Sequence, residues 1–325
     1  MSSPGERTVG VAAGAGAAIL FGSAYVATAF QLHGFTPLGG ALWRSGLAAV
    51  ALAILGVATR RASPRGAGVR GGSDTFEGAL AAGRLVRLAV LGAAGGLCFI
   101  VGMNLAVAWV GATVTAFVAG LYSIVAALFA PLLLDERLEP RAVAGFAVAL
   151  VGTALLAELA PGTDTLRGLA AGGGAAVGFG LYLVLIRRWS RAIHAGPIAV
   201  GLANTTISAV GLAIVLGISD PAGLGPRATP PDVVVATAWL VVASAAGQLL
   251  VTAALRRVEA GLVSSLLLLN PITATVLSAL LLSEVPTAPR LLGGLLVLAG
   301  MAASSDLVGV LRRRRAQESA PEAVR

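Results

Sequence analysis

The stretch Leu132-Leu133-Leu134-Asp135-Glu136 returns 148 positions later as Leu280-Leu281-Leu282-Ser283-Glu284. The same offset continues without a gap through further pairs: Gly145 and Gly293, Gly152 and Gly300, Ala106 and Ala254, Val110 and Val258, Ala112 and Ala260, Leu121 and Leu269, and Ile124 and Ile272. Because apolar sequence of low complexity matches itself by chance, the leucine runs and the paired glycines carry most weight. Self-similarity at one fixed spacing predicts an internal duplication.

The composition places both copies in a membrane. Of the 325 residues, 57% are hydrophobic and 12% are charged, with a mean hydropathy of +0.90, whereas about a quarter of a soluble domain is charged. Apolar runs reach the roughly 20 residues of a membrane-spanning helix, which is too long for the strands of a membrane barrel. We therefore predict an all-α integral membrane protein with ten spans: 9–30, 37–58, 85–108, 112–134, 141–158, 166–186, 197–218, 233–254, 261–283 and 289–309.

The arginines predict the orientation of these spans. All 23 basic residues are arginine, and ten spans with the N-terminus inside place 19 of them on the cytoplasmic side. Arg167, Arg227 and Arg290 fall on the other side, and Arg44 lies within a span. By the positive-inside rule we expect both termini to lie in the cytoplasm.

The excess of positive charge does not indicate a nucleic-acid partner. The net charge is +8, but the arginines are spread over the loops between spans, where anionic lipid headgroups are sufficient partners. The run Arg312 to Arg315 then serves as an anchor against the lipid surface.

The duplication extends to the earlier spans, because Pro37 precedes Arg44 by the same seven residues that separate Pro197 from Asn204. We therefore divide the chain into a cytoplasmic N-terminus (1–8), a first repeat (9–158), a second repeat (166–309) and a basic tail (310–325). Five spans are an odd number, so the two repeats are expected to lie inverted in the membrane. In transporters of this design the substrate site lies near the midplane, between the repeats.

Polar side chains within the spans are the candidate substrate-binding residues. An arginine within a span is costly and is a functional candidate by default, although it could also extend to the interface or cap a neighbouring helix. For the amides the alternative is hydrogen bonding between helices. The candidates are Tyr25, Arg44, Asn104, Tyr122, Asn204, Gln248 and Asn270. In the second repeat, Pro271 follows Asn270 and is expected to bend its span.

The sequence offers little basis for catalysis or for a cofactor. The acids Asp135, Glu136, Glu158, Glu284 and Asp306 all fall at span ends, and the sequence has neither a GxSxG nor an HExxH motif. Cys98 is the single cysteine, and the two histidines lie in different loops, so no metal or other cofactor is expected. We therefore predict that the protein is not an enzyme, and a receptor or scaffold stays open.

The predicted positions of the charged residues also limit the class of substrate. With no acid near the midplane, exchange of permanently cationic drugs against protons on a carboxylate is not expected. An arginine fork matches a carboxylate, so Arg44 favours a zwitterionic or anionic solute.

Several stretches, taken in order, resemble the EamA family of the drug/metabolite transporter superfamily. They are Phe21-Gly22-Ser23, Ala41-Leu42-Trp43-Arg44, Leu132 to Leu138, Leu269-Asn270-Pro271 and Leu281-Leu282-Ser283-Glu284. The resemblance implies a plasma-membrane carrier with a central cavity that exports small polar metabolites such as amino acids or their derivatives, with nucleobases, sugars or drugs as alternatives. A homodimer is an open alternative to a single chain. One departure is Ser283-Glu284-Val285, where the family often has Gly-Glu-Arg.

Overall fold

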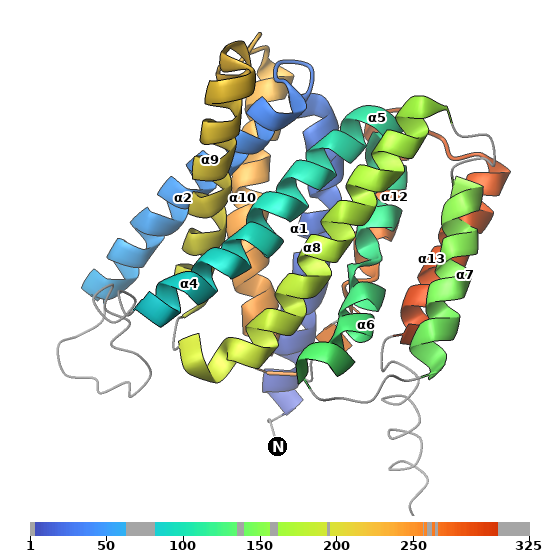
Figure 1. Ribbon diagram of the computed structural model, residues 1–325, viewed down its shortest axis with the longest axis horizontal. Helices are drawn as coiled ribbons and strands as arrows, with labels where there is room; N and C mark the ends of the chain where they lie inside the picture. The colour runs from blue at the N-terminus through green and yellow to red at the C-terminus, as the bar shows by residue number, and fades with distance from the viewer. Residues whose placement is uncertain are drawn as a thin grey trace, which may run out of the picture.

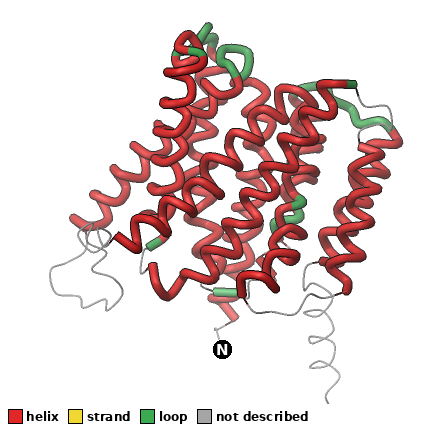
Figure 2. Tube along the Cα trace, in the orientation of Figure 1, coloured by secondary structure: helices red, strands yellow, loops and turns green. Residues whose placement is uncertain are grey.

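The computed structural model describes residues 4–62, 82–134, 140–156, 162–193, 196–255, 257–258, 262–263 and 266–304, and within these ranges it contains helices and no strand (Figure 2). The helices are α1 (Pro4–Gln31), α2 (Pro37–Ala62), α4 (Ala82–Leu91), the π-helix η1 (Gly92–Cys98), α5 (Phe99–Gly120), α6 (Tyr122–Leu134), α7 (Pro140–Leu156), α8 (Thr163–Ile193), α9 (Pro197–Ser219), the 3-10 helix η2 (Pro221–Leu224), α10 (Pro231–Leu255), α12 (Leu269–Leu281) and α13 (Ala288–Ser304). The charged turn at Asp135 and Glu136, the residue Glu158, and Asp306 with the basic tail lie outside the described residues.

The prediction of an all-helical membrane protein is confirmed. Within the described ranges, six helical stretches are long and apolar enough to cross a membrane, and α7, α12 and α13 are shorter apolar helices. One of the six, Gly83–Leu134, covers the third and fourth predicted spans together. Gly111 divides it with φ of 80° and ψ of 172°, a backbone conformation that glycine adopts without steric cost. The predicted boundary between 108 and 112 falls at this turn.

The glutamate of the second leucine run lies at the Gly111 turn. A Cβ atom built at Gly111 would lie 3.1 Å from Oε1 of Glu284, and Thr113 Oγ1 donates a hydrogen bond of 3.4 Å to Glu284 Oε2. The end of α12, in the second repeat, therefore contacts a turn of the first repeat.

Helix contacts repeat between the two halves of the chain. A Cβ atom at Gly22 of α1 would lie 2.5 Å from the Asn270 carbonyl oxygen, and one at Gly180 of α8 would lie 2.8 Å from the Tyr122 carbonyl oxygen. Asn270 and Tyr122 are the positions that the 148-residue offset relates. In Figure 1, α1 starts beside the N marker at the lower edge, whereas α8 starts at the upper edge and descends. Equivalent helices thus make equivalent contacts while running in opposite directions.

The repeated glycines join α7 to α13. A Cβ atom at Gly152 would lie 2.6 Å from the Gly293 carbonyl oxygen, and one at Gly293 would lie 2.6 Å from the Gly152 carbonyl oxygen. Gly300 approaches the carbonyl oxygen of Gly145 in the same way. Lipid is as apolar as the helices, so the hydrophobic effect does not drive helices together in a membrane. Small residues instead let helix backbones approach closely and pack. The glycines that revealed the duplication therefore form a contact between its two copies.

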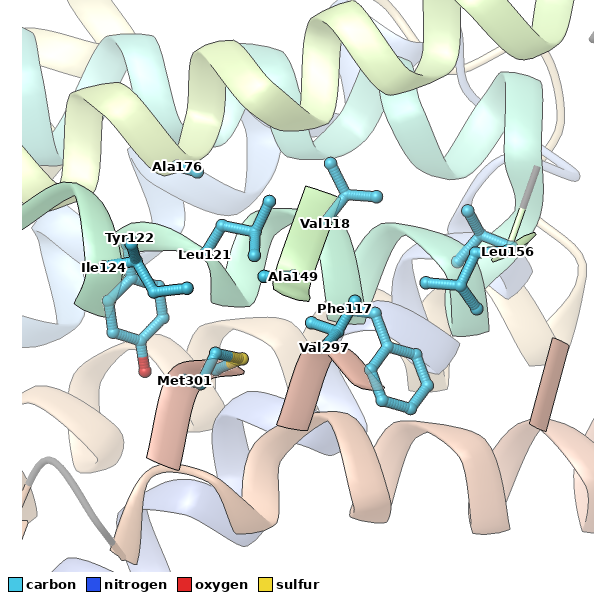
Figure 3. Close-up of a cluster of buried hydrophobic side chains, with 11 residues drawn as sticks. Phe117, Val118, Leu121, Tyr122, Ile124, Ala149, Leu156, Ala176, Val297 and Met301 are labelled. Atoms are coloured by element: carbon cyan, nitrogen blue, oxygen red, sulfur yellow. The ribbon is translucent and has the colours of Figure 1, made fainter. Parts of the chain in front are cut away.

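This α7–α13 pair packs on the rest of the molecule through one apolar cluster. Phe117, Val118 and Leu121 of the α5 region lie against Val297 and Met301 of α13 (Figure 3). The cluster also contains the Tyr122 ring, and its other buried members are apolar, so it mainly supports the fold.

Both repeats interrupt a helix at equivalent positions. Leu121 separates α5 from α6, and its N–H bonds to the Val118 carbonyl as in a 3-10 turn. Residues 267 and 268 form a turn before α12, where the Asn270 N–H bonds to the Leu267 carbonyl. Pro271 consequently lies in the first turn of a helix, where its missing donor costs little, and the expected bend is an interruption just before it.

The departure at Ser283 has a structural consequence. Ser283 has φ of 56°, the left-handed conformation that usually requires glycine after a helix end. Because an L-residue there costs about 1 kcal/mol, we expect Ser283→Gly to raise the thermal unfolding temperature of the purified protein, with Ser283→Ala as the control. An equal or lower unfolding temperature for the glycine variant would contradict this strain.

Candidate functional site

A cavity lies among helices of both repeats, and about 740 Å³ of space, part of it open to solvent, is not occupied by atoms there. Its walls come from α1, α2, η1, α5 and α6 of the first half and from α8, α9, α10 and α12 of the second half. Six of the seven predicted residues line it: Tyr25, Arg44, Tyr122, Asn204, Gln248 and Asn270.

Arg44 is a buried cation in the wall of this cavity. Arg44 is 4% exposed, and among the described residues no carboxylate lies within salt-bridge distance of it. Its Nε donates a hydrogen bond of 3.0 Å to Ser244 Oγ of α10, and its Nη1 lies 3.8 Å from the sulfur of Met103, a weak acceptor. The guanidinium is therefore held in place through Nε while the fork of its two Nη groups has no oxygen acceptor within the described chain.

Tyr25, Asn270 and Tyr122 form a polar group close to Arg44. The Tyr25 side chain interacts electrostatically with Arg44, and Asn270 interacts with both tyrosines. Neither the Tyr25 hydroxyl nor Asn270 Oδ1 makes a hydrogen bond of normal geometry within the described ranges, although both are buried. The interrupted helices bring Tyr122 and Asn270 here, because each residue lies at the start of the helix that follows the break.

The α2 and α9 walls present equivalent faces. Arg44, Ser45 and Ala48 line the cavity from α2, and Asn204, Thr205 and Ser208 line it at the same spacing from α9. Asn204 is 3% exposed. Neither its Oδ1 nor its Nδ2 has a hydrogen-bond partner among the described residues.

Comparison with known proteins assigns the family. The model of the EamA-like transporter family matches residues 8–157 and again residues 166–305. The chain belongs to the EamA-like transporter family. Two matches to one family model agree with the duplication, and members of the family are membrane transporters of small solutes. The chain is therefore a multi-pass membrane protein of this class.

Structural comparison supports the fold of this EamA-like transporter. Among solved structures, 27 chains match it. One, described only as the crystal structure of a protein, is 19% identical, covers 95% of this chain and 99% of its own, and superposes with a TM-score of 0.62. No curated protein sequence matches the chain. At this identity the likeness concerns the fold alone.

Asn104 is the predicted residue that does not line the cavity of the transporter. It is fully buried in α5, where its Nδ2 donates a hydrogen bond of 2.8 Å to the Ile100 carbonyl of its own helix. The position of an amide in a span does not determine which side of the helix it occupies.

Sequence reasoning missed an aromatic cluster beside the cavity. The Phe179 ring of α8 lies 4.8 Å from that of Phe99, 4.9 Å from that of Tyr122 and 5.4 Å from that of Tyr182, measured between ring centroids. Phe99 and Phe179 line the cavity. The available signal was Phe179-Gly180, which corresponds to Phe21-Gly22 in the first repeat. Ser244 accepts the hydrogen bond from Arg44. The one sequence feature that pointed to Ser244 is its position one helical turn before Gln248.

Proposed function

We propose that this protein is a secondary transporter that exports a small polar metabolite bearing a carboxylate, such as an amino acid or a derivative of one. The buried Arg44 guanidinium is the observation that carries the proposal. A buried charge is costly unless it is paired, and a carboxylate can accept two parallel hydrogen bonds from an arginine fork. A bound solute would supply the missing partner of Arg44.

The proposed mechanism is alternating access between two inverted repeats, with ten membrane crossings and both termini in the cytoplasm of the cell. The cavity has walls from both repeats, so relative rocking of the repeats would open it first to one side and then to the other. Close contacts at Gly22 and Gly180 give each half one helix that packs against the other half. Such crossed packing would couple the movements of the two repeats.

Thermal stabilisation of the purified protein tests the substrate class, because a ligand that binds the folded state raises its stability. The panel comprises carboxylic acids, amino acids, nucleosides, sugars and a quaternary ammonium compound. We expect stabilisation by members that carry a carboxylate, followed by their flux in proteoliposomes. Stabilisation by sugars, nucleosides or the quaternary ammonium compound alone would contradict the proposed class. Binding without flux would indicate a receptor.

The Tyr25 hydroxyl provides a finer test of the site. It is buried without a direct hydrogen-bond partner within the described chain, so we expect Tyr25→Phe to leave the unfolding temperature unchanged or slightly higher. A lost hydrogen bond to a charged ligand would weaken binding of the stabilising carboxylate about tenfold. Unchanged affinity in a titration with that ligand would remove Tyr25 from the site.

A further inference from the structure

The charge of the cavity wall distinguishes between two kinds of carboxylate. Arg44 is the one charged residue among the described residues that line the cavity, and no aspartate or glutamate joins it there. A zwitterion would place its carboxylate on Arg44 and leave its ammonium group without a counter-charge. Burying an unpaired charge is strongly unfavourable. A solute with a single negative charge avoids that cost.

Asn204 indicates what the rest of the solute presents. Its Oδ1 accepts hydrogen bonds and its Nδ2 donates them, and both atoms are buried without such partners in the described ranges. Neighbouring hydroxyls donate elsewhere: Ser208 Oγ to the Asn204 carbonyl at 2.7 Å, and Thr205 Oγ1 to the Gly201 carbonyl at 2.9 Å. The Tyr182 hydroxyl of α8 lies near the amide but makes no hydrogen bond of normal geometry with it.

A side-chain amide is satisfied most fully by a group that places one donor and one acceptor on the same edge. Primary carboxamides, ureides and lactams have this arrangement, because their N–H and C=O lie on the same side of the bond. Asn204 and Arg44 occupy equivalent positions on α9 and α2 and line one cavity, so the inference requires a solute that contacts both.

We propose that the cavity selects monoanionic acids that carry a lactam, ureide or carboxamide group, in preference to free amino acids. This inference rests on the proposed function, since it assumes that Arg44 binds the carboxylate of the transported solute. Arg44 provides the charge match, and Asn204 determines the specificity for the neutral polar group.

Three acids that each carry a five-membered ring test the inference. At neutral pH, 5-oxoproline is a monoanion with a lactam, cyclopentanecarboxylate is a monoanion without one, and proline is a zwitterion. We expect the full-length protein to bind 5-oxoproline about tenfold more tightly than cyclopentanecarboxylate, as two added hydrogen bonds imply. Proline should bind at least tenfold more weakly than 5-oxoproline.

Asn204→Leu removes the amide while keeping a similar volume. We expect this variant to bind 5-oxoproline and cyclopentanecarboxylate equally, because neither acid then has an amide partner at this position. Asn104→Leu is the matched control, because Asn104 is a buried amide that does not line the cavity, and it should keep the tenfold preference. Thermal unfolding without ligand verifies that both variants are folded.

The outcomes separate this inference from the proposed function. Equal binding of proline and 5-oxoproline, or a preference that persists in Asn204→Leu, would overturn the inference. Arg44-dependent binding of cyclopentanecarboxylate would then still support recognition of a carboxylate. If the folded protein bound none of the three acids, both the inference and the role of Arg44 in carboxylate binding would be wrong.

Discussion

Replacing Arg44 by alanine is expected to abolish transport, with a loss of at least about thirtyfold in initial flux, because a buried charge-assisted contact is worth about 2 kcal/mol or more to a ligand. The guanidinium is the one charged group described in the cavity wall, and its Nη groups have no oxygen acceptor within the described chain. Flux of a stabilising carboxylate into proteoliposomes measures the loss.

The stability of the same variant distinguishes binding from a structural role. Arg44→Ala removes a buried cation that has no carboxylate partner among the described residues, so the unfolding temperature without ligand should stay the same or rise. Arg44→Lys keeps the charge without the planar fork and should recover only part of the flux. Arg167→Ala, at an exposed arginine of α8 paired with Asp164 at 3.4 Å, is the control. Normal flux in Arg44→Ala, or a large loss of stability, would identify Arg44 as structural.

The architecture could be predicted from the sequence because a duplication leaves evidence at many positions. The 148-residue offset relates Gly145 to Gly293 and Gly152 to Gly300, and the structure brings these glycines into contact across α7 and α13. Paired glycines persist where backbones touch, since no larger residue fits. Within 83–134 the predicted boundary between 108 and 112 falls at the Gly111 turn, whereas the sequence did not predict the π-helix η1 or the turn at Leu121.

The candidate site was predictable in part, and its gaps have physical reasons. Arg44 was evident because charge within a span is costly. The break at Leu121 has no proline, and a leucine gives no local sign of a 3-10 turn. Ser244 and Phe179 are residue types common in membrane helices. Their roles in the site follow only from the residues that they contact in the fold. Which amide side chains face the cavity depends on how each helix is rotated about its own axis, and hydropathy does not indicate that rotation.

The two repeats differ at equivalent positions that line the cavity. Gly96 of η1 corresponds to Ser244 of α10 through the same offset, and each contacts the α2 or α9 helix of the other repeat. Ser244 uses its hydroxyl to hold Arg44. Gly96 instead lets η1 approach the backbone of Asn204, the position equivalent to Arg44. One repeat thus presents a positioned cation, and the other presents a neutral amide.

Replacing Gly96 by serine, the residue at the equivalent position of the second repeat, should therefore impair stability and transport. In Gly96→Ser, the new Cβ atom would overlap the Asn204 carbonyl oxygen and lie 2.5 Å from Ser208 Oγ. A backbone carbonyl cannot move aside as a flexible side chain can, so η1 and α9 must separate. Overpacking of this kind lowers the free energy of unfolding by about 1–3 kcal/mol. We expect a lower unfolding temperature and at least a tenfold loss of flux, since Asn204 moves with its helix.

Gly46→Ser supplies the matched control for this prediction. Gly46 belongs to α2, two residues beyond Arg44, and a Cβ atom there would meet nothing within 4 Å. The same substitution should therefore leave both flux and unfolding temperature close to those of the unmodified protein. If Gly96→Ser also transported normally, the close approach of η1 to α9 would not be required for the cavity, and the difference between Gly96 and Ser244 would have no role in recognition. A loss confined to Gly96→Ser would instead tie the geometry of Asn204 to transport, because the two variants add the same hydroxymethyl group to helices that line the same cavity.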